Sequence, residues 1–184
     1  VIAAKPEQPL KGDALTAQQA WLELGGTITA DLSSIKTADI IIDGLLGTGI
    51  QSEVREPFAQ LIEAANESQV PVVAIDLPSG INADTGSIMG VAVNADVTAT
   101  FMGRKRGMYT HDGLEYSGQI EFNDLDIPFE SFQKLGDSDC YKLEHHLLSA
   151  RNRNSHKGNF GHVLVIGGDD GYLGASQMAA EAAM

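Results

Sequence analysis

Cysteine, basic residues and long hydrophobic runs are scarce in this chain. Its 184 residues include one cysteine, Cys140, which excludes an internal disulfide and a metal site built from several cysteines. So little cysteine is typical of a reducing compartment, and we predict a cytoplasmic protein. Acidic residues outnumber basic ones by 25 to 12, and the net charge of −13 disfavours nonspecific binding to nucleic acid or anionic membranes. Since no long apolar run accompanies the 43% hydrophobic content, we expect a soluble globular protein.

Several motifs that mark common enzymes are also missing. The chain has no G-x-S-x-G, complete Walker A, G-x-G-x-x-G or H-E-x-x-H pattern. Without G-x-G-x-x-G, an NAD-dependent dehydrogenase of the Rossmann type lacks support. The five histidines show no metal-binding spacing, and no stretch resembles a signal peptide. The sequence begins at Val1 rather than at a methionine and ends within a helix-like run, so we expect a fragment.

The chain does contain an alternation of strand-like and helix-like segments. Short runs of Ile and Val at 38–46 and 70–77 are typical of strands covered on both faces, as in a parallel sheet. Between them, residues 57–66 place apolar side chains on one face of a predicted helix. The alternation favours a Rossmann-like, doubly wound parallel α/β sheet. Further strands are expected at residues 1–4, 27–30, 96–102, 118–122 and 162–166, with helices at 13–24 and after Gly174.

The character of the sequence changes in its last third. Residues 124–155 have weak periodicity and little Ile or Val, which predicts a linker with a helical part. A second strand, glycine turn and helix follow. Residues 155–158 and the glycines of 167–174 could hold a nucleotide-like ligand, or could only allow close packing of helix on strand. We predict two domains, at 1–139 and 140–184.

Two aspartates follow the two strongest predicted strands, and glycines lie close behind each of them. Asp43 begins the run D-G-L-L-G-T-G, and Asp76 begins D-L-P-S-G. Because ligands of open parallel sheets bind outside the carboxyl ends of the strands, both side chains should face one crevice. One could bind a cation or a ribose while the other acts as an acid or base. Each could instead only cap its own turn by a hydrogen bond to the backbone.

Other polar segments accompany these aspartates. The backbone amides of Gly47-Thr48-Gly49 could cradle a phosphate where the next helix begins, or could form a plain turn. Ser79 adds a hydroxyl that, with carboxylate and carbonyl oxygens, suits a hard cation. The basic run Arg104-Lys105-Arg106 follows a predicted strand and could offset phosphate charge, or could be a solvated loop.

Together these segments resemble the bifunctional NAD(P)H-hydrate repair enzymes, which join an NAD(P)HX epimerase domain to an ADP- or ATP-dependent NAD(P)HX dehydratase domain. The matching stretches occur in the family's order over nearly the whole chain: D-G-L-L-G-T-G (43–49), R-E-P (55–57), A-I-D-L-P-S-G-I-N-A-D-T-G (74–86), N-A-D-V-T-A-T-F (94–101), S-H-K-G-N-F-G-H-V-L-V-I-G-G (155–168) and G-Y-L-G-A (171–175). The resemblance implies repair of hydrated NADH and NADPH by epimerisation in the first domain and dehydration in a ribokinase-like second domain. It is compatible with a homo-oligomer that acts on this small molecule.

The resemblance also implies roles for individual residues. Asp43 and Ser79 look like ligands of a potassium ion, and Asp76 matches a substrate-binding residue and is the best candidate acid or base. The dehydratase half would use ADP or ATP with magnesium. The hydrated nucleotide would be contacted by Asp76, by the loop residues Gly47, Thr48, Gly49, Ile50, Gln51, Ser52 and Glu53, and by Ala175.

The chain departs from the family at three points. It lacks the N-N-G-G-D-G loop, which supplies another potassium ligand and substrate contacts, and the later G-T-G-D segment with the dehydratase's catalytic aspartate. Gln51 stands where some relatives carry a basic residue, which leaves the proton-transfer partner of Asp76 open. The alternative is a non-catalytic nucleotide-binding module with the same fold.

Overall fold

The structure, a computed structural model, divides into two compact units, Val1–Cys140 and Tyr141–Met184. It describes residues 1–128, 130–131, 140–142, 153–159, 161–169, 171 and 173–183. Among the described helices, none is long and apolar enough to cross a membrane.

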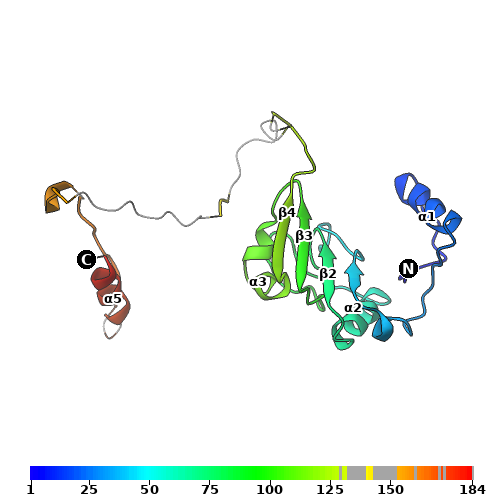
Figure 1. Cartoon of the computed structure of the whole chain (residues 1–184). Coiled ribbons are helices and arrows are strands. Elements are labelled where there is room, and N and C mark those ends of the chain that lie inside the picture. The colour runs from blue at the N-terminus through cyan, green and yellow to red at the C-terminus, as the bar shows by residue number, and fades with distance from the viewer. Residues whose placement is uncertain are drawn as a thin grey trace. The chain divides into compact units, whose positions relative to one another are not determined.

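A four-stranded sheet forms the centre of the first unit (Figure 1). Its strands lie in the order β1-β2-β3-β4, and each pairs in parallel with its neighbour. They are β1 (Ile41–Asp43), β2 (Val72–Ile75), β3 (Val97–Phe101) and β4 (Gln119–Asn123). The predicted parallel α/β fold is therefore confirmed, although most strands are shorter than the apolar runs that predict them.

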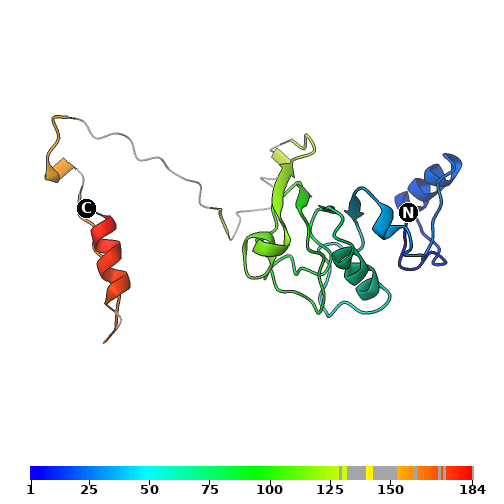
Figure 2. The ribbon, with the colours of Figure 1, turned by 60° about the horizontal axis from the view of Figure 1, so that its bottom comes forward.

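Helices and loops cover one face of this sheet. The helix α2 (Phe58–Glu67) connects β1 to β2, and it buries Leu61, Ile62 and Ala65. Ile62 packs with Val72 and Ala74 of β2 in one core cluster. A second cluster, built from Leu77, Ile81, Ala92 and Met108, continues the core toward β4. Figure 2 shows α2 against the sheet, and η2 (Arg106–Tyr109) and α3 (Gly113–Tyr116) connect β3 to β4.

The opposite face of the sheet is largely bare among the described residues. Successive side chains of a strand point to opposite faces, so the residues between the buried ones form a second apolar surface. On this surface Ile42 is 66% exposed and Ile75 is 41% exposed. The burial of Asp43 and Ala74 on the covered face fixes which side of the sheet is filled.

The N-terminal segment forms less sheet than the sequence predicts. The strands predicted at 1–4 and 27–30 are reduced to one isolated parallel bridge between Ile2 and Thr29. Two hydrogen bonds hold it, from the Ala3 amide to the Thr29 carbonyl (2.9 Å) and from the Thr29 amide to the Val1 carbonyl (3.0 Å). The predicted helix is present as α1 (Asp13–Glu23), and the short η1 (Ile35–Thr37) leads into β1.

The second unit contains η3 (Lys157–Asn159) and the helix α5 (Gly174–Ala182), which the sequence predicts. The strand predicted at 162–166 is wrong, because residues 161–169 have no regular structure. A strand needs a neighbour for its backbone hydrogen bonds, and these residues pair with no described segment. Their apolar side chains accordingly remain exposed, by 73% at Val163 and 86% at Ile166. Most of the predicted linker lies outside the described residues.

Candidate active site

Asp43 ends β1 and is 4% exposed. Its two carboxylate oxygens accept hydrogen bonds from Ser79: Oδ1 from the hydroxyl (2.7 Å) and Oδ2 from the backbone amide (2.8 Å). The Leu45 amide also donates to Oδ1, at 3.2 Å. Asp43 therefore caps its own turn through Leu45, and through Ser79 it also connects the end of β1 to the loop that follows β2.

Ser79 gathers further oxygen atoms around the same point. It is 1% exposed, and its hydroxyl accepts a hydrogen bond from the Leu46 amide at 2.9 Å while lying 3.2 Å from the Leu46 carbonyl oxygen. A carboxylate, a hydroxyl and a carbonyl oxygen thus lie together with one formal negative charge. Hard cations take such all-oxygen ligands, so this donor set fits potassium. In the described part of the chain, no group of three or more His, Cys, Asp or Glu residues could hold a metal ion.

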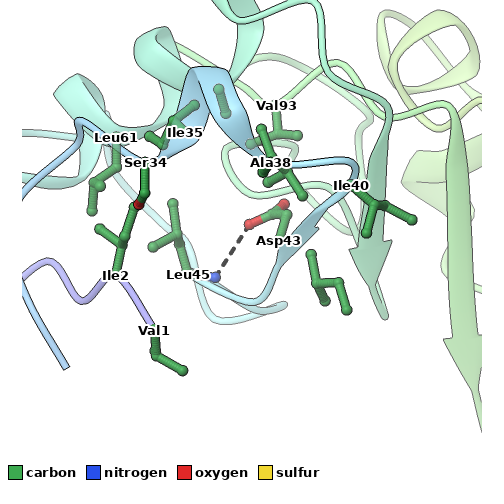
Figure 3. A pocket seen from close by; sticks show the side chains of 13 residues that line it. Val1, Ile2, Ser34, Ile35, Ala38, Ile40, Asp43, Leu45, Leu61 and Val93 are labelled. Atoms are coloured by element: carbon green, nitrogen blue, oxygen red, sulfur yellow. Dashed lines mark hydrogen bonds between the residues drawn. The ribbon is translucent and has the colours of Figure 1, made fainter. Parts of the chain in front are cut away.

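A cavity of about 390 Å³ lies beside Asp43. Asp43 is the only residue with a charged side chain in its lining, as the otherwise largely apolar walls in Figure 3 show. Ile41 and Ile42 of β1, with Ile40 just before them, contribute one wall, and Leu61 contributes from α2. The cavity therefore offers an apolar surface with one anionic group at its side.

Asp76 directly follows β2 in a left-handed conformation, with φ of 71°. This conformation is uncommon for residues other than glycine, although aspartate and asparagine adopt it more readily than most. Its amide donates to the Ala99 carbonyl of β3 (2.7 Å), and its carboxylate forms an ion pair with Lys105. The Asp76 side chain is 31% exposed, so the backbone turn leaves its carboxylate partly open to solvent.

A second cavity, of about 550 Å³, lies beside Asp76. Its remaining lining comes from one stretch of chain, Phe101 to Lys105, at the end of β3. Asp43 and Asp76 thus lie at the ends of neighbouring parallel strands but line different cavities among those described. Asp43 bonds Ser79 while Asp76 bonds groups of β3 and of the loop beyond it, so the one crevice that the sequence expects for both stays a prediction.

The loop of Gly47, Thr48, Gly49, Ile50, Gln51, Ser52 and Glu53 connects β1 to α2 and is mostly exposed. Its two ends are fixed, by the hydrogen bond between Leu46 and Ser79 and by the Val54 amide, which donates to the Met89 carbonyl at 2.8 Å. The loop therefore presents open backbone beside the Asp43 and Ser79 cluster. Ala175, the predicted contact of the second domain, is exposed in the first turn of α5.

Sequence reasoning misses two contributors to these sites. The first is Lys105, which in the sequence is only part of a basic run and which in the structure forms an ion pair with Asp76. Its neighbours make other contacts: the Arg104 guanidinium lies 4.6 Å from the centre of the Phe122 ring, and Arg106 donates to the Asp84 carbonyl at 2.7 Å. Arg104 also lines the cavity beside Asp76. The second is the Leu46 carbonyl. Every residue has a backbone carbonyl, so the residue type does not show which one contributes to a site.

The fold and these sites define a class: a parallel α/β protein with polar side chains at the carboxyl edge of its sheet, where such proteins bind ligands. The family described as "YjeF-related protein N-terminus" matches residues 1–107, and the chain belongs to this family. The resemblance that the sequence predicts is thereby confirmed.

Curated relatives agree with this assignment. The "Bifunctional NAD(P)H-hydrate repair enzyme Nnr" of Escherichia coli (strain K12) is 38% identical over 187 residues, which cover 100% of this chain and 36% of the relative. The protein of the same name from Coxiella burnetii is 46% identical over 149 residues, covering 79% of this chain and 30% of the relative. The chain thus spans about a third of the length of these relatives.

A solved structure resembles the chain in fold. The crystal structure of yeast ynu0 matches with a TM-score of 0.57 and covers 76% of this chain and 60% of its own. At 18% sequence identity, this likeness supports the parallel α/β fold alone.

Proposed function

We propose that this protein repairs hydrated NADH and NADPH, and that the unit built around its sheet interconverts the R and S forms of NAD(P)HX. Membership of the family and the names of the relatives support the substrate class. The observation that carries the proposal is the pair of carboxylates at the carboxyl edge of the sheet. One lies in an oxygen cluster suited to a cation, and the other is partly exposed beside a cavity.

The chemistry needs one proton and one water molecule. In its acid form, Asp76 gives a proton to the hydroxyl on C6 of the reduced ring, and the C6–O bond breaks with its electron pair leaving as water. The neighbouring ring nitrogen shares its lone pair with C6 in the cation that results. Water then adds to the opposite face and gives its extra proton to solvent, and the partly exposed Asp76 carboxylate takes up a proton from solvent to restore the acid form. The reaction changes configuration at C6 without oxidation or reduction.

Asp43, Ser79 and the Leu46 carbonyl would hold the potassium ion. When bound, such a cation supplies positive charge that offsets the phosphates of the substrate. The open loop of residues 47–53 directly follows Leu46, so its backbone amides would contact the nucleotide close to this charge. Asp43 itself is held in place by its bonds to Ser79, which prepare the oxygen atoms before any ligand arrives.

The remaining functions concern the whole protein. We propose that a second domain, of which Ala175 contacts the substrate, dehydrates the S form with ADP or ATP and magnesium. A cytoplasmic location and a homo-oligomer complete the proposal. The exposed Val163, Leu164 and Ile166 of the second unit provide apolar side chains that a complete ribokinase-like sheet would bury.

The substitution Asp76→Asn tests the proposed role of this aspartate. Asparagine matches aspartate in size and tolerates the left-handed backbone at this position, so the fold should persist. Without the proton carrier, we expect the rate of R-to-S conversion to fall by ~100-fold or more. The assay separates R- and S-NADHX by chromatography, in the natural protein that contains residues 1–184, after subtraction of the uncatalysed rate.

Asp39→Asn is the matched control, because Asp39 is an exposed aspartate ahead of β1 with no role in either site. It should leave the rate unchanged. If Asp76→Asn converts the substrate as fast as this control, Asp76 does not carry the proton and the mechanism is wrong.

A further inference from the structure

The two carboxylate oxygens of Asp76 have unequal surroundings. Oδ1 accepts hydrogen bonds from the Thr100 hydroxyl and from the Phe101 amide, each at 3.3 Å, and it is the atom that pairs with the Lys105 ammonium. Oδ2 accepts no hydrogen bond from any residue that the structure describes. The groups that contact Oδ1 all lie at the end of β3 or in the loop beyond it.

Lys105 is fixed by the same group of atoms. Besides Asp76, its Nζ contacts the Thr100 hydroxyl at 3.1 Å and the Phe101 carbonyl at 3.0 Å. These three acceptors match the three hydrogens of an ammonium group. The Lys105 side chain is 17% exposed, which is about half the exposure of the Asp76 side chain. An ammonium with all its donors engaged is held beside Asp76 rather than extended toward solvent.

We propose that Lys105 is a positioning residue for Asp76. Together with the Thr100 hydroxyl and the Phe101 amide it fixes Oδ1, and it thereby makes Oδ2 the oxygen that exchanges a proton with the substrate. This inference rests on the proposed function of Asp76 as the acid of epimerisation. It also supplies the partner for Asp76 that the sequence leaves open, from a part of the chain that the sequence links only to phosphate charge.

The physical basis is that a carboxylic acid carries its proton on one oxygen at a time. Three donors directed at Oδ1 stabilise a form in which that oxygen accepts hydrogen bonds, so the proton resides on Oδ2. The donors also prevent rotation of the carboxylate group. The reacting oxygen is thus held in one place, and misplacement by about 1 Å can cost ~100-fold in rate.

The test compares two substitutions of Lys105 in the natural protein that contains residues 1–184. Lys105→Met keeps the apolar stem and removes the charge and all donors, whereas Lys105→Arg keeps a cation with donors. We expect Lys105→Met to lower kcat for conversion of NADHX by ~100-fold with KM within ~3-fold of the wild type. Lys105→Arg should recover activity to within ~10-fold of the wild type. Lys36→Met, at an exposed lysine of η1, is the matched control and should change neither constant.

A double variant shows whether Lys105 acts through Asp76. Since Asp76→Asn already removes the proton carrier, adding Lys105→Met should lower the residual rate no further. Far-ultraviolet circular dichroism of each variant confirms that the fold is retained. If Lys105→Met unfolds the chain, Lys105→Gln, which keeps a donor and loses the charge, takes its place with the same expected loss of kcat.

Three outcomes would overturn the inference. An unchanged kcat in Lys105→Met would show that the clamp on Oδ1 is dispensable. A higher KM with unchanged kcat would make Lys105 a ligand of the substrate. A further loss in the double variant would give it a role independent of Asp76. The proposed function fails separately, when Asp76→Asn alone retains full activity.

Discussion

At the scale of single residues, Ser79 connects parts of the chain that are far apart in sequence. Its hydroxyl and amide reach Asp43, 36 residues earlier, and its hydroxyl also meets Leu46. All these contacts are buried or partly buried, and removal of the hydroxyl loses those to Asp43 Oδ1 and Leu46 while the backbone amide keeps its bond to Asp43 Oδ2. Ser79 therefore contributes to stability as well as to the oxygen cluster that fits a cation.

Ser79→Ala should lower the free energy of unfolding by about 1–3 kcal/mol, because it removes a partner from the buried Asp43 carboxylate. Urea denaturation followed by circular dichroism measures this loss. Potassium chloride should raise the wild-type Tm above its value in choline chloride, and the variant should lose this difference. A potassium-dependent shift that persists in Ser79→Ala would remove this hydroxyl from the proposed cation site.

Ser33→Ala is a matched control, because it breaks a serine–aspartate hydrogen bond of the same 2.7 Å length at an exposed position. There, the side-chain hydrogen bond from Ser33 lowers the pKa of the Asp31 carboxyl, which is fully exposed. We expect its effect on unfolding to be small compared with that of Ser79→Ala. A loss as large as that of Ser79→Ala would show that burial is not the cause.

At the scale of elements, replacing isoleucine by alanine should destabilise the protein much more in the core than on the bare face of the sheet. Ile62 of α2 is 0% exposed in the core, whereas Ile42 of β1 is 66% exposed on the bare face. Ile62→Ala should therefore lower the free energy of unfolding by about 2–5 kcal/mol through the cavity it leaves. Ile42→Ala should cost less than about 1 kcal/mol, mainly through lower strand propensity. Equal losses in urea denaturation of the 184-residue chain would mean that something covers Ile42 in solution.

Elements with a long apolar period were predictable, and those without one were not. The periodic face of α2 and the Ile and Val runs before Asp43 and Asp76 predict a helix and two strands that the structure contains. The four-residue α3 and η2 are too short to show a period. The strand predicted at 162–166 is wrong for another reason, since a strand forms only where a neighbouring strand, often distant in sequence, pairs with it.

The candidate site was predictable to a similar degree. The position of Asp43 and Asp76 at strand ends follows from the pattern alone. Their separate surroundings do not, because they depend on the left-handed backbone of Asp76 and on bonds to Ser79 and Lys105. Lys105 lies five residues beyond Thr100, and only the turn after β3 brings both to one carboxylate oxygen.

At the scale of the whole molecule, burial is distributed unevenly along the chain. The helix α5 buries no side chain, whereas α2, of nearly the same length, buries three. A nine-residue helix without packing is marginal in water, because most helical stability in proteins comes from a buried face. Local opening should therefore be much easier in α5 than in the central sheet.

Amide hydrogen exchange of the 184-residue chain tests this difference. We expect amides of β2, β3 and α2 to exchange at least ~100-fold more slowly than those of α5, as measured by mass spectrometry of peptic peptides. The comparison of α2 with α5 is internally matched, since both are helices of similar length in one sample. Equal protection of the two helices would show that α5 is packed in solution.

The exposed isoleucines of the sheet also affect the choice of stability assay and storage buffer for this protein. Dyes whose fluorescence rises in apolar surroundings, as used in thermal-shift assays, would bind at Ile42 and Ile75 in the folded protein before any heating. The dye fluorescence of the folded protein would then be high in every sample, and shifts of Tm caused by a ligand would be obscured. Label-free optical or calorimetric readouts avoid this background, and mild non-ionic detergent in storage buffers would limit adhesion to plastic and self-association.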